Sequence, residues 1–205
     1  MNPIDKLTDA FERFPGIGPR QARRFVQYLL SAPPSVRAEL AENMRLLGAS
    51  SSQCKKCFRW FARDQRRSDL CTICGSRNRD NALLFVVEKD ADIDTVERSG
   101  FRGLYFVLGG TIPLAAEEPQ KFVRLRELVK RVEEDASQNI LKEVIFGLSA
   151  TTEGDHTRLL LQEKLRSIAE GFSLKLSSLG RGLSTGSELE YADPETIANA
   201  LNSRN

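Results

Sequence analysis

The cysteine content constrains the fold of this chain more than any other feature. The 205-residue sequence holds four cysteines, and they form two close Cys-x-x-Cys pairs, Cys54 with Cys57 and Cys71 with Cys74. Two such pairs can surround one Zn²⁺ ion tetrahedrally with four thiolates. Because no cysteine is left over, the pattern predicts a closed, structural metal site.

The remaining composition is that of a globular protein of the cytoplasm. Hydrophobic residues make up 40% of the chain and charged residues 28%, which is ordinary for a folded globular protein. No apolar run approaches the roughly 20 residues that span a bilayer. The acidic, amphipathic start, MNPIDKLTDAFERF, does not resemble a secretory signal. We therefore expect a cytoplasmic protein without a membrane segment.

Two other uses of paired cysteines fit this sequence less well. Disulfides belong to oxidising compartments, whereas thiols in the cytoplasm are kept reduced. A redox Cys-x-x-Cys motif normally occurs singly, beside a βαβ unit. The segment around the two pairs is too short to fold by hydrophobic burial, so a metal would stabilise it. We predict one zinc ion per chain, bound by a four-cysteine finger.

The distribution of charge says more than the net charge of +2. Between residues 11 and 30 there are four arginines against one glutamate, and residues 54–79 carry eight basic residues against two aspartates. The basic residues of the second segment are Lys55, Lys56, Arg59, Arg63, Arg66, Arg67, Arg77 and Arg79. Such patches attract polyanions, although a solvated basic face remains the alternative for either one.

Residues 4–31 predict two helices joined by a glycine-rich turn, Phe-Pro-Gly-Ile-Gly-Pro-Arg at 14–20. Gly16 and Gly18 allow backbone conformations and close approaches that side chains forbid. Pro19 suits the first turn of the second helix, whose free N–H groups favour an anion.

The second of these helices carries polar side chains suited to a phosphate backbone. Arg20, Arg24 and Gln27 fall opposite the apolar stripe of the helix. The pattern is typical of a helix-hairpin-helix, which binds DNA without reading its sequence. A plain turn between two antiparallel helices is the alternative.

The rest of the chain alternates between strand and helix patterns. A third N-terminal helix is expected to end at Gly48. Helices are also expected over 119–134 and 155–171, and Asp193 with Pro194 predicts the start of a last one. The apolar runs that read as strands are Leu83–Val87, Leu104–Leu108, Glu143–Ser149 and Leu174–Leu179. This alternation predicts an α/β unit with a largely parallel sheet.

Three carboxylates follow strands of this expected sheet. Glu88 ends the first strand, and Glu153 and Asp155 follow the third. The carboxyl ends of strands are where open α/β sheets place their sites, and converging carboxylates suit Mg²⁺. The alternative is that these acids cap helices, with Asp155 as the N-cap of its own helix.

Taken together, these segments resemble the RecR family of bacterial recombination proteins over nearly the whole chain. The matching pieces, in order, are the turn at 14–20, the cysteine finger at 54–74, Val-Val-Glu at 86–88, Arg-Gly-Leu-Tyr-Phe-Val-Leu-Gly-Gly at 102–110, Thr-Glu-Gly-Asp at 152–155, and Arg-Gly-Leu…Leu-Glu-Tyr-Ala-Asp at 181–193. Two stretches depart from the family pattern. Thr111–Gln120 lacks the expected glycine and aspartate, and the Leu183–Ser187 loop is unusually rich in hydroxyls, at Ser184, Thr185 and Ser187.

The resemblance implies an α+β chain of several parts. These would be a helix-hairpin-helix region over 1–53, a four-cysteine zinc finger over 54–79, an α/β Toprim domain with a mostly parallel sheet over 80–180, and an oligomerisation tail over 181–205. By the matched motifs, Gly16, Gly18, Arg20 and Arg24 would contact DNA. Glu88, Glu153 and Asp155 would form the Toprim acidic site, a possible magnesium site.

The resemblance also implies a function without catalysis. RecR-like proteins form ring-shaped homo-oligomers, commonly tetramers, that can enclose DNA. With RecO, and RecF where present, they help RecA replace single-strand-binding protein at gaps, on single- and double-stranded DNA without sequence preference. The alternative is a small Toprim nuclease or phosphotransfer enzyme that depends on Mg²⁺.

Overall fold

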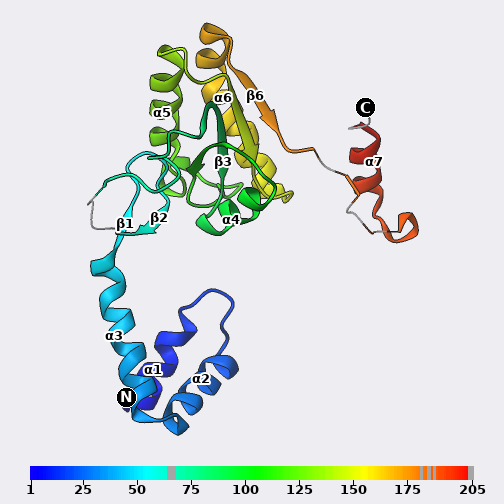
Figure 1. The fold of residues 1–205 in the computed structure, drawn as a ribbon. Coiled ribbons are helices and arrows are strands. Elements are labelled where there is room, and N and C mark those ends of the chain that lie inside the picture. The colour runs from blue at the N-terminus through cyan, green and yellow to red at the C-terminus, as the bar shows by residue number, and fades with distance from the viewer. Residues whose placement is uncertain (64–67, 181, 184–185, 187, 203–205) are drawn as a thin grey trace. The chain divides into compact units, whose positions relative to one another are not determined.

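The computed structural model describes residues 1–63, 68–180, 182–183, 186 and 188–202, and leaves out the side chains of Glu195 and Asn202. The chain forms two compact units, Met1–Ser52 and Gln53–Asn205 (Figure 1). Among the helices in the described ranges, none combines the length and the apolarity that crossing a bilayer requires.

The N-terminal unit consists of three helices, α1 (Pro3–Glu12), α2 (Pro19–Ser31) and α3 (Pro34–Ser50). Where α1 packs on α2, the rings of Phe11 and Phe25 meet edge to face with centroids 5.6 Å apart. Ala22 and Val26 are buried, as the apolar stripe of the second helix predicts.

The prediction that α3 ends at Gly48 is wrong. The helix runs through Gly48 to Ser50, where Ser51 adopts an extended backbone and begins β1 (Ser51–Gln53). Gly48 does not take the left-handed conformation that ends helices. A single glycine costs a helix interior about 1 kcal/mol, which is tolerated.

The finger begins with a two-stranded sheet of β1 and β2 (Trp60–Ala62). The Cys54 N–H donates to the Arg59 carbonyl at 2.8 Å, and the Gly75 N–H donates to the Cys71 carbonyl at 2.9 Å. These bonds close a tight turn at each cysteine pair. Cys54, Cys57 and Cys71 belong to the same buried cluster as the core of the α/β part, so finger and sheet share one core.

The α/β part is built on a four-stranded parallel sheet in the order β4-β3-β5-β6. The strands are β3 (Asp80–Val87), β4 (Gly103–Val107), β5 (Glu143–Gly147) and β6 (Lys175–Ser178). The helices between them are α4 (Asp90–Arg98), α5 (Leu125–Ser137) and α6 (Thr152–Phe172). The predicted parallel α/β unit is confirmed. Buried side chains on both neighbours of β3, Phe106 on β4 and Phe146 on β5, pair in register with Val86.

Two helix starts differ from the sequence expectation. A 3₁₀ turn occupies Pro119–Lys121, and α5 starts only at Leu125 because the Arg124 N–H donates to the Leu108 carbonyl at 2.9 Å instead of joining a helix. Likewise, α6 starts three residues before the expected position. Its N-cap is Thr151, whose hydroxyl accepts the Gly154 N–H, and not Asp155.

The chain ends in a 3₁₀ turn, Leu189–Tyr191, and helix α7 (Pro194–Asn202). The predicted cap is confirmed, because the Asp193 carboxylate accepts the Thr196 N–H at 2.8 Å. Ser184, Thr185 and Ser187 of the hydroxyl-rich loop lie outside the described residues, as do Asp64, Arg66 and Arg67 of the basic segment.

Candidate metal centre and nucleic-acid interface

The finger gathers the four cysteines as their spacing predicts. Cys54, Cys57 and Cys71 are buried and Cys74 is partly buried. Their four sulfur atoms all lie within 4.8 Å of one another. In the part of the chain that the structure describes, this is the one group of three or more His, Cys, Asp or Glu side chains that could hold a metal ion.

The electrostatics of the cluster fit a cation. Hydrogen bonds with the neighbouring thiols, Cys57 first, lower the pKa of Cys54, whereas hydrogen bonds with Cys54 and the other thiols, together with burial, raise the pKa of Cys74. Sulfurs this close cannot all ionise without a positive charge between them. A bound metal ion supplies that charge, and four thiolates are a suitable donor set for Zn²⁺.

The first cysteine pair is fixed to the sheet. The Cys57 carbonyl accepts the Val107 N–H at 2.9 Å, and the ring of Phe58 meets Phe106 edge to face with centroids 5.4 Å apart. Phe58 takes a left-handed backbone conformation (φ 63°), which is uncommon for a bulky residue. The first cysteine turn therefore packs directly against the edge strand β4.

Helix α5 adds a second anchor to the finger. Arg131 is buried, forms an ion pair with buried Asp135, and donates to the Lys56 carbonyl at 2.9 Å. Removing one partner of a buried ion pair leaves an uncompensated charge, which is costly. Asp135 thus neutralises Arg131, and the hydrogen bond from Arg131 to the Lys56 carbonyl joins the first cysteine turn to α5.

The number of basic residues in the finger is larger than the number of positive charges that remain unpaired. Three of the described basic residues are paired with carboxylates of the same chain. The pairs are Lys55 with Asp69 at 2.5 Å, Arg59 with Asp94 at 3.1 Å, and Arg79 with Glu97. The solvated-face alternative accordingly accounts for part of this patch.

The turn between α1 and α2 uses its two glycines differently. Gly16 has φ +78°, which a side chain adopts only with strain, whereas Gly18 is extended (φ −90°) and is the N-cap of α2. A Cβ at either position meets nothing within 4 Å. The expected special backbone conformation is found at Gly16, and the close approach of a ligand to Gly18 stays a prediction.

This difference predicts the stability of two matched variants. We expect Gly16→Ala to lower the free energy of unfolding by about 1 kcal/mol because of its backbone strain. Gly18→Ala should cost less, about 0.5 kcal/mol, because neither the conformation nor the space opposes a methyl group and only the preference for glycine over alanine at an N-cap is lost. Urea unfolding of both variants checks this, and equal losses would contradict it.

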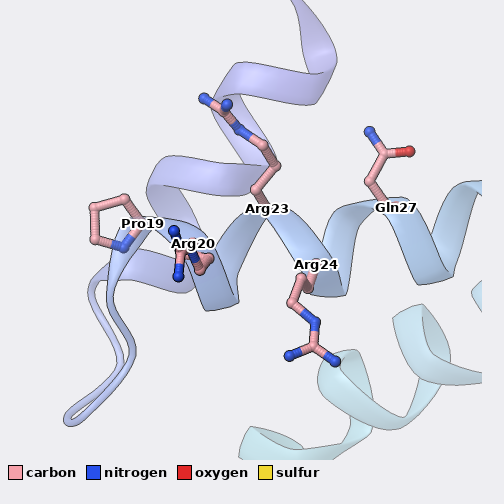
Figure 2. Close-up of a pocket in the computed structure, with 5 residues that line it drawn as sticks. All are labelled: Pro19, Arg20, Arg23, Arg24 and Gln27. Carbon is pink, nitrogen blue, oxygen red and sulfur yellow. The ribbon is translucent and has the colours of Figure 1, made fainter.

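The face of α2 turned to solvent carries a cationic cluster. Arg20, Arg23, Arg24 and Gln27 are exposed and, with Pro19, line a hollow of about 660 Å³. Figure 2 shows Arg23 and Arg24 leaving the helix in opposite directions, with Arg20 near its start. Among the residues described, none forms an ion pair or hydrogen bond with these three guanidinium groups.

Arg23 is a candidate that helical spacing alone does not identify. Arg20 and Arg24 lie opposite the apolar stripe, whereas Arg23 lies between those two positions and the stripe. The sequence signal that could have identified Arg23 is the presence of three arginines within little more than one helical turn. At the start of α2, which has no side-chain cap, the free N–H groups and these guanidinium groups together suit phosphate.

The acidic residues lie at the carboxyl ends of two neighbouring strands. Glu88 follows β3 and accepts the Ser149 N–H at 2.5 Å, after the end of β5. Glu153 and Asp155 lie in the first turn of α6, where Asp155 forms an ion pair with Arg158 at 3.3 Å. Within the described ranges these carboxylates do not converge into a ligand group of the kind that the cysteines form. A magnesium site here stays a prediction.

Three family models match the chain. The model "RecR, helix-hairpin-helix" covers residues 4–46, "Toprim domain" covers 82–175, and "RecR, C-terminal" covers 182–205. The predicted combination of a helical N-terminus, a four-cysteine cluster and a Toprim domain with a parallel sheet is thereby confirmed.

Similar proteins carry the same family name. The chain is 38% identical to Recombination protein RecR of Bifidobacterium longum subsp. infantis, over 98% of this chain and 94% of that protein. It is 37% identical to the RecR protein of Herpetosiphon aurantiacus, over 98% and 93%, and 36% identical to that of Prochlorococcus marinus strain MIT 9215, over 98% and 94%. On its fold, its cysteine cluster and these matches, the chain belongs to the RecR family of recombination proteins.

Proposed function

We propose that this chain is a DNA-binding mediator of recombinational repair in the cytoplasm. In this proposal it forms a homo-oligomeric clamp, a tetramer, on gapped DNA. With RecO, and RecF where present, it helps RecA replace single-strand-binding protein. Membership of a family of recombination proteins supports a role in recombinational repair. The observation that carries DNA binding is the exposed arginine cluster of α2 beside the open glycine turn.

Binding would act through phosphates and not through base sequence. Arg20, Arg23 and Arg24 offer charge-assisted hydrogen bonds, and the start of α2 offers free N–H groups. One hairpin reaches few phosphates, so its affinity is modest. When several copies share one ring, the binding of one hairpin raises the effective concentration of the other hairpins near the same DNA. Binding is then stronger without any new kind of interaction.

The four parts of the chain would divide this work. We assign DNA contact to 1–53, metal binding to 54–79, a Toprim scaffold to 80–180, and subunit contact to 181–205. For the cysteines we propose one Zn²⁺ ion per chain with a structural role, since all four thiolates would be used and none is left for a substrate.

We propose no catalytic step at the acidic edge. The similar proteins are named as recombination proteins, and the Asp155 carboxylate is already paired with Arg158. A Toprim nuclease would need its carboxylates to hold Mg²⁺ together.

The test is RecA filament formation on gapped DNA coated with single-strand-binding protein, with the cognate RecO present. Adding this protein should accelerate filament formation and leave the DNA strands intact. The matched control is Glu88→Gln, which should accelerate it equally. No acceleration, with Mg²⁺-dependent strand cutting that Glu88→Gln abolishes, would instead identify a Toprim nuclease.

A further inference from the structure

Trp60 stands out on the surface of the finger. It is the only tryptophan of the chain, and 59% of its surface is exposed. The strand β2 alternates, so that Phe61 packs against the shared core while Trp60 and Ala62 face solvent. A large aromatic side chain left in water is the kind of group that binding surfaces use.

The backbone around Trp60 is firmly held. Its N–H donates to the Asp90 carboxylate, with both oxygens at 3.3 Å. The backbone carbonyl of the preceding residue, Arg59, accepts the Cys54 N–H, and the Arg59 guanidinium donates to Asp94. Because these bonds tie the strand to the metal turn and to α4, the backbone that carries the indole is already in place before a ligand binds, which lowers the entropy cost of binding.

The charges near the indole point to a particular class of ligand. Lys55 and Arg59 are already paired with acids, and the Asp90 carboxylate accepts the Trp60 N–H. The finger also carries Lys56, Arg63 and Arg77, and proteins that bind single strands combine such cationic side chains with exposed aromatic rings. The flat indole surface itself suits the face of a nucleobase better than it suits a phosphate.

We propose that Trp60 stacks on an unpaired base of single-stranded DNA. The inference rests on the proposed DNA-binding function and deepens it: the hairpin of α2 binds phosphates, and the finger binds bases. Bases are available for stacking only where the strand is unpaired, so Trp60 would favour the single-stranded side of a gap. The metal, in turn, would keep this stacking surface in place.

Fluorescence of the intact protein tests the stacking directly, because all tryptophan emission comes from Trp60. Titration with oligothymidylate should quench it, as stacking on a base does. An abasic strand of the same length and charge should quench it much less. Equal emission changes with both strands, or no change while fluorescence anisotropy of labelled DNA shows binding, would overturn the proposal and leave the proposed function intact.

Variants separate stacking from charge. Trp60→Ala should weaken oligothymidylate binding about tenfold, by the same factor at low and high salt, while Trp60→Phe should restore most of it. Blunt duplex DNA should bind both variants as it binds the unchanged protein. If Trp60→Ala, with normal zinc content, binds oligothymidylate as tightly as the unchanged protein does, the proposal is overturned.

Two further outcomes are distinguishable. If anisotropy shows no DNA binding by the unchanged protein, the proposed function itself fails, and this inference with it. If emission instead changes on dilution without DNA, and Trp60→Ala shifts the oligomeric state in sedimentation, Trp60 lies at an interface between copies of the chain and the proposal is wrong.

Discussion

Replacing Cys57 and Cys71 with serine should abolish metal binding and unfold the finger. Structural zinc contributes about 10–16 kcal/mol to the folding of isolated finger peptides, which is comparable to the whole stability of a domain. Because three of the cysteines lie in the core shared with the sheet, the α/β part should become less stable as well. Elemental analysis should find one zinc per unchanged chain and none in this variant, whose melting temperature should fall sharply.

A neighbouring substitution provides the control. Thr72 is exposed between Cys71 and Cys74, so Thr72→Ala should keep both the zinc and the melting temperature. A chelator, or acid that protonates the thiolates, should reproduce the effect of the double variant. Unchanged chain that contains no zinc after purification without chelators would refute the metal assignment.

Removing the arginine cluster of α2 should have the largest effect on DNA binding. We expect alanine at Arg20, Arg23 and Arg24 to weaken duplex binding strongly at low salt. The slope of log affinity against log salt should fall in magnitude by about 0.9 for each phosphate that the protein no longer neutralises. Since these side chains are exposed, the melting temperature should stay unchanged. A salt titration of DNA affinity measures the affinity and the slope together.

Arg45 offers a matched control in the same unit. It is exposed on α3 and paired with Glu42 at 2.6 Å. Arg45→Ala removes one positive charge, as each of the three substitutions on α2 does, and leaves α2 itself unchanged. Its affinity and salt slope should remain those of the unchanged chain. If the triple variant also kept its salt slope, the hairpin would not be the phosphate-binding element.

Sequence alone predicts the features that depend on neighbouring residues. The spacing of Cys54, Cys57, Cys71 and Cys74 defines the metal cluster, since each pair needs only one tight turn. The cap at Asp193 and the positive φ of Gly16 are equally local. Strands of apolar residues such as Leu83–Val87 are recognisable because both faces of a parallel sheet are covered.

Features that join distant parts of the chain were not predictable in this way. Arg59 meets Asp94 35 positions away, and Arg131 reaches the carbonyl of Lys56 across 75 positions. Counting charges along a segment cannot reveal such pairs. The late start of α5 has the same origin, because the N–H of Arg124 is taken by the carbonyl of Leu108, on the segment after β4.

The hydrogen bond from Val107 to Cys57 has a consequence for solubility. β4 is the outermost strand on its side of the sheet, and the finger occupies part of its free edge through that bond. An uncovered strand edge is a template on which other chains add strands. A molecule stripped of its metal would therefore tend to aggregate edge to edge, so that in a cell the metal supply would govern how much of this protein stays in solution.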